Sequence, residues 1–594
     1  MNKLRRFFLA IACAALLSTA WAADNAQPQG TDGKGQSAEL QQLKAQLEQQ
    51  QKQIEQLRSI LEAQQKLLEK TQSAPASQGN IATQNKTAGQ AATQAQANVD
   101  PTPAPADTDH KAPNLGDVAS TVPIIPRGVA PIATPLPLPE PAPQAAQDQI
   151  PESPLQLRLG SSTITPVGFM DLTNTFRSSA SGTSFATNFG SYPYNNNLPS
   201  GRLTEDRFSA GNSRIGFRVD NTYKGIHTLG YFEGDFVGGI GSLANNTQVT
   251  SNSLVFRIRL YWVDVRKDQF EFLAGQSWSM MTPNRNGISA LPGDLFYGQE
   301  FDVNYLNGLT WGRIPGLRFL YHPTKTVTFG ISAENASQYF GGSGGGGVPT
   351  LPTALSGLTS NELDASVANG QSIANVRPDI IAKLAIQPNS RIHFEFAGVT
   401  DQFKIFNPNT TGAGALTYFS KVGGGGSVNG NFEVVKNFRI VTNNFWSDGA
   451  GRYLFGVAPD FILQANGNPS LIHAGSTLDG FEARVKKTQI YGYYGSIYVG
   501  RDTAYDTNGT TLIGYGFHGS ANSQNRSTQE GTFGITQTFF NDPKYGAVSM
   551  YLDYAYFWRA PWYVAAGAPK NAHQNAVWFD LRYTLPGSAP TIGY

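Results

Sequence analysis

Charged side chains that alternate with apolar ones are the residues of this chain whose types and spacing could do chemistry. The segment "LVFRIRLYWVDV", residues 254–265, is the clearest case. Successive side chains of a β-strand point to opposite faces. As a strand, this segment would carry large apolar groups on one face and two guanidiniums on the other. The apolar set is Phe256, Ile258, Leu260 and Trp262, and the opposite set is Arg257, Arg259 and Tyr261.

Two preceding segments, "SRIGFRV" at 213–219 and "GYFEGDF" at 230–236, alternate in the same way. If the three segments are neighbouring strands, their charges would either form ion pairs that hold a wall together or create a field that orients anions. The sequence leaves both interpretations open. Because four arginines outnumber two acids, we expect a preference for anionic or zwitterionic solutes. The residues expected on this charged face are Arg214, Arg218, Glu233, Asp235, Arg257, Arg259 and Tyr261.

The histidines give little support for catalysis. The chain has seven histidines, and no two of them form a spaced metal-ligand pair such as HExxH. A Ser-His-Asp triad is assembled in space and leaves no spacing to recognise in the sequence. A hydrolase built on the β-barrel predicted below therefore remains the weaker alternative to a protein without catalytic activity. We predict that the protein is not an enzyme and has no catalytic residues, metal or cofactor.

The N-terminus predicts export. A basic stretch beginning at Lys3 precedes an apolar run at 7–17, and "AWA" at 20–22 supplies the small residues for cleavage, so residues 1–22 read as a signal peptide. Cys13 is the only cysteine and lies within this signal, which leaves the mature chain without disulfides. The net charge of +1 and the 15% of charged residues argue against a nucleic-acid partner.

Residues 38–72 predict a short α-helical coiled coil. An apolar residue recurs at every seventh position and forms one seam along the helix, so we expect the helix to oligomerise. The second seam is partly polar, so a single, partly frayed helix also fits the sequence. Residues 73–154 are rich in Ala and Gln and then in Pro, and we expect a disordered linker there. The two seams are Leu40, Leu47, Ile54, Leu61 and Leu68, and Leu43, Gln50, Leu57, Gln64 and Thr71.

Residues 155–594 predict an all-β fold, a transmembrane antiparallel β-barrel of about 16 strands. Seven short polar clusters are each flanked by alternating segments, and long loops rich in Gly, Asn, Ser and Pro separate one cluster from the next. Seven short turns join seven pairs of strands, and one more strand is available at each end, at 165–176 and 575–586. The clusters lie at 221–225, 266–269, 322–325, 387–390, 435–437, 485–488 and 541–546.

The alternating faces indicate which side of the barrel faces water and which side faces lipid. A soluble sandwich could bury the apolar faces, but it needs neither an export signal nor strictly alternating short and long connections. In lipid every backbone group must be paired within the protein, and a closed barrel meets that condition. An arginine facing lipid at mid-depth would cost about 2–4 kcal/mol. We therefore expect Arg257 and Arg259 to face inward, onto water.

A barrel of this size is too wide for side chains to fill, so it encloses an aqueous channel unless something plugs it. By analogy with general porins, whose third loop folds into the barrel, the segment 282–302 is the candidate constriction. An ordinary extracellular loop is the alternative. The charged residues of this segment are Arg285, Asp294, Glu300 and Asp302.

Several motifs resemble porins related to DcaP, an exported family with an N-terminal coiled coil before the barrel. They are "RFSAGNSRIGFRVD" at 207–220, "GYFEGDF" at 230–236, "FLAGQSWS" at 272–279 and "DLRYTLP" at 580–586. The resemblance implies a trimeric sixteen-stranded porin that admits small solutes, with dicarboxylates as a family precedent. It also implies lumenal arginines at Arg214, Arg218, Arg257 and Arg259. One departure is "GSAPTIGY", which follows Pro586 where such chains usually stop at an aromatic residue closing the last strand.

Together these features predict a passive diffusion channel in the bacterial outer membrane, with the coiled coil in the periplasm. The expected partners are outer-membrane lipid, two further copies in a homotrimer and small hydrophilic solutes, with a preference for organic anions. The alternative is a structural barrel whose coiled coil and linker tether the envelope by contacting peptidoglycan or other periplasmic components.

Overall fold

The structure is a computed structural model that describes residues 154–180, 187–194, 199–238, 255–290, 306–342, 345–356, 375–406 and 418–587. The chain divides into two units between residues 113 and 114, and every described residue belongs to the second. The predicted signal peptide, the predicted coiled coil and all of the predicted linker except Pro154 lie outside the described residues. No helix among the described residues is long and apolar enough to cross a membrane.

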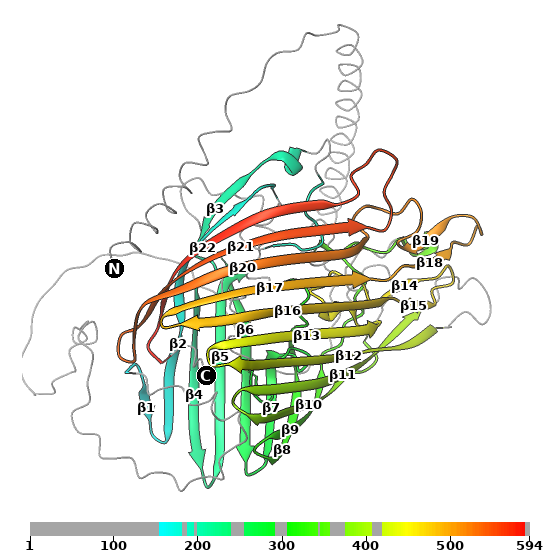
Figure 1. The fold of residues 1–594 in the computed structure, drawn as a ribbon. Coiled ribbons are helices and arrows are strands. Elements are labelled where there is room, and N and C mark those ends of the chain that lie inside the picture. The colour runs from blue at the N-terminus through cyan, green and yellow to red at the C-terminus, as the bar shows by residue number, and fades with distance from the viewer. Residues whose placement is uncertain are drawn as a thin grey trace, which may run out of the picture. The chain divides into compact units, whose positions relative to one another are not determined.

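The described residues form a closed antiparallel barrel, as the sequence predicted. Its 18-stranded sheet includes two short strands, β1 and β3, which leaves sixteen wall strands. Strand β3 continues into β4 across a short break at 210–213, and the two together make the second wall strand. The ring closes at β2, which pairs with β22 along one edge and with β3 and β4 along the other. Consecutive wall strands lie side by side in chain order (Figure 1).

The wall strands are 8 to 18 residues long, enough to cross a bilayer when tilted. They are β2 Ser162–Arg177, β4 Arg214–Tyr223, β5 Ile226–Gly238, β6 Val255–Lys267, β7 Phe270–Trp278, β8 Arg313–Thr324, β9 Val327–Glu334, β10 Asp379–Asn389, β11 Ile392–Phe406, β12 Tyr418–Val435, β13 Phe438–Asp448, β16 His473–Val485, β17 Thr488–Val499, β20 Asn525–Asp542, β21 Gly546–Pro561 and β22 Ala572–Thr584.

Short elements accompany the wall. Strand β1 forms a hairpin with the start of β2, while β14 pairs with β15 and β18 pairs with β19 in the long loops. Three single-turn 3₁₀ helices complete the described elements. The bounds are β1 Leu157–Leu159, β3 Glu205–Ser209, β14 Phe461–Leu463, β15 Pro469–Leu471, β18 Asp502–Tyr505 and β19 Leu512–Tyr515, with helices at Pro199–Arg202, Thr353–Leu355 and Gly451–Tyr453.

All seven predicted short turns join consecutive wall strands at one end of the barrel. Tight hairpin turns require a positive φ in the connecting residues. Asp268 and Asn437 supply it at 55° and 66°, and Lys224 and Lys486 adopt it at 49° and 58° despite their longer side chains. The long connections lie at the opposite end, so the alternation of short turns and long loops is confirmed.

The two faces of the wall differ as the alternation predicted. On β4, Ile215 and Phe217 point outward and are 53% and 47% exposed, whereas Arg218 points inward and is 6% exposed. The same pattern holds on β22, where Phe579 and Leu581 face outward and Asp580 and Arg582 face inward. The outer face is therefore apolar over most of the wall, as contact with lipid requires.

Strand β6 departs from the alternation at one position. The register with β5 slips there, because Glu233 pairs with Leu260 while the next residue, Gly234, pairs with Ile258. Arg259 is the extra residue of a β-bulge, and a bulge shifts the residues that follow to the opposite faces. The expectation was therefore wrong for two residues: Leu260 lies on the inner face and Tyr261 on the outer face.

The contacts around the bulge show the new arrangement. Tyr261 is 65% exposed, and its ring lies 6.3 Å from the ring of Phe232 on the outer face. Trp262 is 4% exposed and stacks on Tyr231 on the inner face. The structure thus places Tyr261 on the outer face of the wall, opposite to the lumenal position predicted from strict alternation.

The bulge makes Tyr261→Arg a sensitive test of the two faces. The substitution puts a guanidinium on the lipid face near mid-strand, and we expect the free energy of unfolding to fall by about 2–4 kcal/mol. Tyr261→Leu is the control and should change this free energy little. Urea unfolding in lipid vesicles, followed by tryptophan fluorescence, measures both variants. Equal stabilities would show that residue 261 faces water.

Candidate functional site

A ladder of ion pairs runs across the inner face of β4, β5 and β6. The register places Asp235 of β5 between Arg214 of β4 and Arg257 of β6. Arg257 binds Asp235 through two contacts of 2.7 and 3.0 Å. Arg259 lies 2.7 Å from Glu233 and 2.8 Å from Asp235, so one guanidinium joins both acids. Four of the predicted residues therefore form one network.

Two further predicted residues lie beside this network. The Arg214 guanidinium lies 3.9 Å from the Glu233 carboxylate and 5.0 Å from the centre of the Phe169 ring. Arg218, one step nearer the short turns, binds Asp220 at 2.7 to 2.9 Å. Asp220 was missed by the sequence analysis. Its place two residues after Arg218 on the same strand, and hence on the same face, could have revealed it.

The exposure of these side chains separates two roles. Arg259 is 1% exposed and is surrounded by its two acids, as expected of an ion pair that holds the wall together. The Arg257 side chain is 35% exposed and that of Arg214 is 19% exposed. These two arginines hold charge where water reaches it, so the ladder combines wall-building pairs with exposed positive charge.

The loop between β7 and β8 begins inside the barrel. Met280 and Ile288 are buried, and a Cβ built on Gly330 of β9 would lie 3.1 and 3.2 Å from their side chains. The backbone N–H of Met280 donates to Glu334 at 2.8 Å, and that of Asn284 donates to Glu395 at 3.0 Å. The described first arm of the loop thus lies against the inner face of β9 to β11.

Ion pairs anchor this first arm. Lys383 of β10 donates to the carbonyl of Thr282 at 2.8 Å and pairs with Glu395 of β11 at 2.8 Å, and both charges are fully buried. Arg285 reaches further and makes a two-pronged contact with Glu482 of β16 at 2.6 and 2.7 Å. Two parallel N–H···O bonds fix the position of a guanidinium as well as its charge.

The returning arm of the loop lies against the far wall. Asn307 donates its backbone N–H to Glu530 of β20 at 2.7 Å, and Thr310 donates to Asn443 of β13 at 3.0 Å. Gly308, at φ 89°, lies so close to β16 that a Cβ would meet the Thr477 carbonyl at 2.3 Å. The described parts of the loop therefore contact inner-face residues from β9 to β20. Asp294, Glu300 and Asp302 lie outside the described residues.

Other long loops pack at the same end of the barrel. Tyr192, in the connection between β2 and β3, lies 5.1 Å from the ring of Phe557 and accepts a hydrogen bond from Arg559 at 2.7 Å. The loop between β13 and β16 is buried at Asp460, which accepts from the backbone N–H of Arg452 at 2.8 Å. Burial raises the pKa of Asp460 well above its usual range, and the nearby Asp401 adds to this effect.

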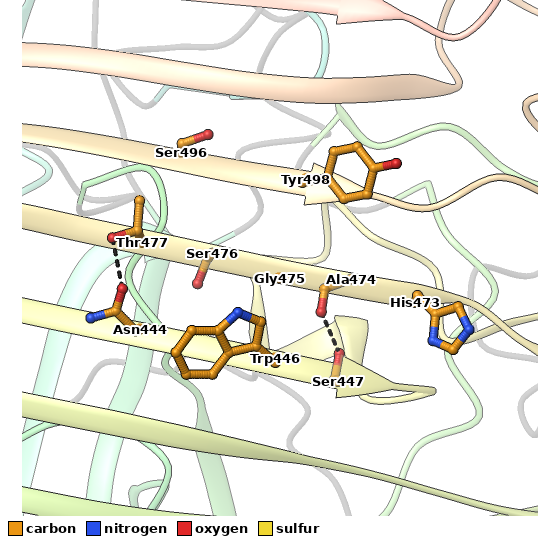
Figure 2. A pocket seen from close by; sticks show the side chains of 10 residues that line it. All are labelled: Asn444, Trp446, Ser447, His473, Ala474, Gly475, Ser476, Thr477, Ser496 and Tyr498. Atoms are coloured by element: carbon orange, nitrogen blue, oxygen red, sulfur yellow. Dashed lines mark hydrogen bonds between the residues drawn. The ribbon is translucent and has the colours of Figure 1, made fainter.

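A separate hollow of about 500 Å³ lies on the outer face of the wall, lined by residues of β13, β16 and β17. Asn444, Trp446, Thr477 and Tyr498 border it, and Figure 2 shows these side chains along three neighbouring strands. None of the predicted lumenal residues contributes to it. Within the described ranges, no group of three or more His, Cys, Asp or Glu residues could hold a metal ion.

Comparison with solved structures finds the same wall in the outer membrane channel DcaP of Acinetobacter baumannii. The match has a TM-score of 0.50 at 15% sequence identity and covers 72% of this chain and 98% of that one. This chain shares the fold of DcaP. The fold expected from the motifs at 207–220, 230–236, 272–279 and 580–586 is thus confirmed.

Other porins match with lower scores. An anion-selective porin from Comamonas acidovorans has a TM-score of 0.38 at 10% identity, covering 71% of this chain and 99% of that one. Salmonella typhi OmpF in complex with daunomycin has a TM-score of 0.38 at 9% identity, covering 72% of this chain and 100% of that one. No protein-family model matches the chain. No curated protein matches it either.

The two-pronged contact of Arg285 gives a direct test of the loop. Arg285→Ala removes the pair with Glu482, and we expect water to solvate the freed carboxylate and loosen the arm. Single-channel recording should then show a larger and noisier conductance. Arg391→Ala is the control, because the Arg391 side chain is 59% exposed and its pair with Glu433 is long, at 4.0 Å. Conductance equal to that of the unchanged chain would mean that this arm does not limit the channel.

Proposed function

We propose that this protein is a porin of the bacterial outer membrane, a passive diffusion channel for small hydrophilic solutes. The observation that supports the proposal best is the closed sixteen-strand wall with charged side chains inside and apolar side chains outside. A wall of this size leaves an aqueous lumen unless something fills it. The fold shared with DcaP agrees with this function but does not by itself assign it.

A preference for organic anions is the second part of the proposal. The inner face of β4 to β6 holds five arginines, the four predicted ones and Arg266, against four acids, Glu233, Asp235, Asp220 and Asp264. The most exposed charged side chain among these nine is that of Arg257. A positive charge beside a narrow aqueous path attracts anions and repels cations. In this proposal the carboxylate of an organic acid binds Arg257 and Arg214 in the way that the carboxylates of Asp235 and Glu233 do.

The in-folded loop supplies the narrowing in this proposal. Its first arm carries Arg285 to the wall opposite β6, and its returning arm follows the same wall. A solute would then pass between the loop and the exposed arginines of β4 and β6. We further propose that export by the N-terminal signal delivers the chain to the outer membrane. There the periplasmic coiled coil and the barrels would assemble into a homotrimer.

The anion preference is tested at Arg257. One unit charge 10 Å from a passing ion in water contributes about 0.4 kcal/mol before screening, favourable for an anion and unfavourable for a cation. Without screening, Arg257→Ala should therefore lower the anion-to-cation permeability ratio about four-fold. Arg257→Lys keeps the charge and serves as the matched control. Reversal potentials across planar bilayers in a salt gradient measure both. An unchanged ratio for the alanine variant would remove Arg257 from the selectivity of the channel.

Arg259 is a poor target for the same test. It is buried and paired with two acids, and breaking a buried ion pair by removing one partner typically costs about 3–5 kcal/mol. Arg259→Ala should therefore lower the free energy of unfolding by about this amount. Urea unfolding in vesicles, with Arg257→Ala alongside, checks the difference. Equal effects of the two variants would contradict the structural role assigned to Arg259.

A further inference from the structure

Two arginines lie over one tryptophan ring at the long-loop end of the wall. The guanidinium carbons of Arg501 and Arg526 are 5.3 and 6.0 Å from the centre of the Trp562 ring. Arg501 follows the end of β17, and Arg526 lies at the start of β20. Both arginines are exposed. We call these three residues the arginine cluster.

Contacts with the wall and with a loop hold the tryptophan in place. The indole Nε1 of Trp562 donates to the carbonyl of Val499 at 3.0 Å. A Cβ built on Gly516 would lie 2.6 Å from the Trp562 ring, so the backbone of this loop packs directly against the ring. An aromatic face attracts a guanidinium that lies over it. The fixed ring therefore keeps two positive charges near each other.

No acid neutralises the arginine cluster. Among the residues that the structure describes, no carboxylate forms an ion pair or a hydrogen bond with Arg501 or Arg526. Asp502, the next residue after Arg501, is hydrogen-bonded to a serine of the adjacent loop instead. Asp448 lies 3.3 Å from His473 and stands on β13, two strands away from β17. The positive charge of the cluster is thus available to an anionic ligand.

The hollow of Figure 2 lies next to the arginine cluster. Tyr498 joins the two, because its ring lies 6.1 Å from the Trp562 ring and it also lines the hollow. Trp446 lines the opposite side, and the register places Gly475 between Trp446 and Tyr498 (Figure 2). The two rings stand on strands about 9–10 Å apart. Glycine contributes no side chain to the space between the rings, so they form the two sides of an open groove.

The groove runs down the wall from the long-loop end to a polar end. His473 borders it at the first end, and Thr477 borders it further along β16, about 13 Å away. Thr477 donates to Asn444 at 2.9 Å. Ser496 lies beside Thr477 on β17, and its hydroxyl has no partner within the described part of the chain. The groove therefore has aromatic sides and one unused hydroxyl at its deeper end.

We propose that the groove and the arginine cluster together bind one phosphorylated lipid of the outer leaflet. The proposal rests on the position of the barrel in the outer membrane. The long loops of such a barrel face outside, so the arginine cluster lies at the level of the lipid headgroups. Guanidiniums bind phosphate through strong charge-assisted N–H···O bonds, and basic clusters at a membrane surface recognise anionic headgroups. The phosphate of the lipid therefore binds Arg501 and Arg526.

The groove holds the rest of the lipid. An acyl chain that descends from a phosphate on the arginine cluster enters the space between Trp446 and Tyr498. Tryptophan and tyrosine rings favour this level of a membrane, because each has an apolar body and a polar edge. The carbonyl groups of a lipid lie between its phosphate and its tails, where the Ser496 hydroxyl donates to one of them. A free phosphate ion would use the cluster alone, so the groove selects a lipid.

A fluorescent label beside the groove tests the site with brominated lipids, which quench fluorescence on contact. Cys13 is the only cysteine and lies in the predicted signal, so Tyr494→Cys gives the exported chain one labelling position. Tyr494 is exposed on the outer face of β17, one row deeper than Ser496. In phosphatidylcholine vesicles, brominated phosphatidylglycerol should quench this label more strongly than brominated phosphatidylcholine at the same mole fraction. A label at Leu581→Cys, on the outer face of β22, should show no such preference. An equal preference at both labels would overturn the proposal.

Removing the charge of the cluster tests the phosphate contact. Each basic residue at an anionic membrane surface raises affinity about five-fold. The double variant Arg501→Gln, Arg526→Gln should therefore lower the affinity for phosphatidylglycerol, relative to phosphatidylcholine, about twenty-five-fold. Arg391→Gln is the matched control, because it removes an exposed arginine at the short-turn end of the barrel. A preference that survives in the double variant would contradict the proposal.

Two outcomes would identify a different occupant. Inorganic phosphate, compared with chloride at equal ionic strength, should leave the preference for phosphatidylglycerol in place, because a free ion makes no contact in the groove. Loss of the preference in phosphate would show that the cluster binds soluble anions. A label at Tyr494→Cys that neither lipid quenches would show that a protein surface covers the groove. Either result would overturn the proposal.

Filling the groove tests where the acyl chain lies. Gly475→Leu places a branched side chain between the two rings and leaves both arginines unchanged, so the preference for phosphatidylglycerol should fall several-fold. Gly398→Leu is the matched control on the outer face of β11, where a Cβ would meet only the Gly425 carbonyl, at 3.7 Å. Equal loss in both variants would count against the groove. The arginine variants cover the case in which Gly475→Leu does not fold. No readout depends on solute passage, so the lipid site and the channel function can fail separately.

Discussion

Lipid tails can neither donate nor accept hydrogen bonds, and the rest of this structure depends on that constraint. Every backbone amide and carbonyl in the wall must find a partner on a neighbouring strand, which only a closed sheet provides along its whole length. The pairing of β2 with both β22 and β4 removes the last free edges. Once the ring is closed, alternation along each strand divides the side chains between lipid and lumen.

The inner face shows what charged residues do when they share a narrow interior. Arg259 and Lys383 are fully buried and paired with acids on adjacent strands, so their charges hold the wall together. Arg285 uses the same chemistry across the barrel and fixes a loop to Glu482. Only where pairing leaves a guanidinium accessible, as at Arg257, does charge remain for a passing solute. The two interpretations of the arginine rows thus apply to different residues of one network.

The outer face follows the lipid rule almost everywhere, and its departures are informative. The bulge at Arg259 changes which side chains of β6 meet lipid without breaking the rule, because Tyr261 and Val263 replace Leu260 and Trp262 there. Asp479, in the middle of β16, breaks the rule itself, because its side chain lies on the outer face. Its carboxylate accepts hydrogen bonds from the hydroxyls of Thr442 and Thr477, at 2.6 Å each.

The sequence by itself determined the local features of this protein. The seven short turns, the two terminal strands and the faces of Ile215 and Arg218 follow from a period of two and from turn residues, which are properties of neighbours along the chain. Only the tertiary structure decided the sides of Tyr261 and Trp262, because a bulge depends on the partner strand. It alone also joined Arg285 to Glu482, 197 residues away, and placed Thr442, Asp479 and Gly531 in one row. Side chains on different strands become neighbours only when register and closure are fixed, and no period along the chain encodes which strand will lie beside which.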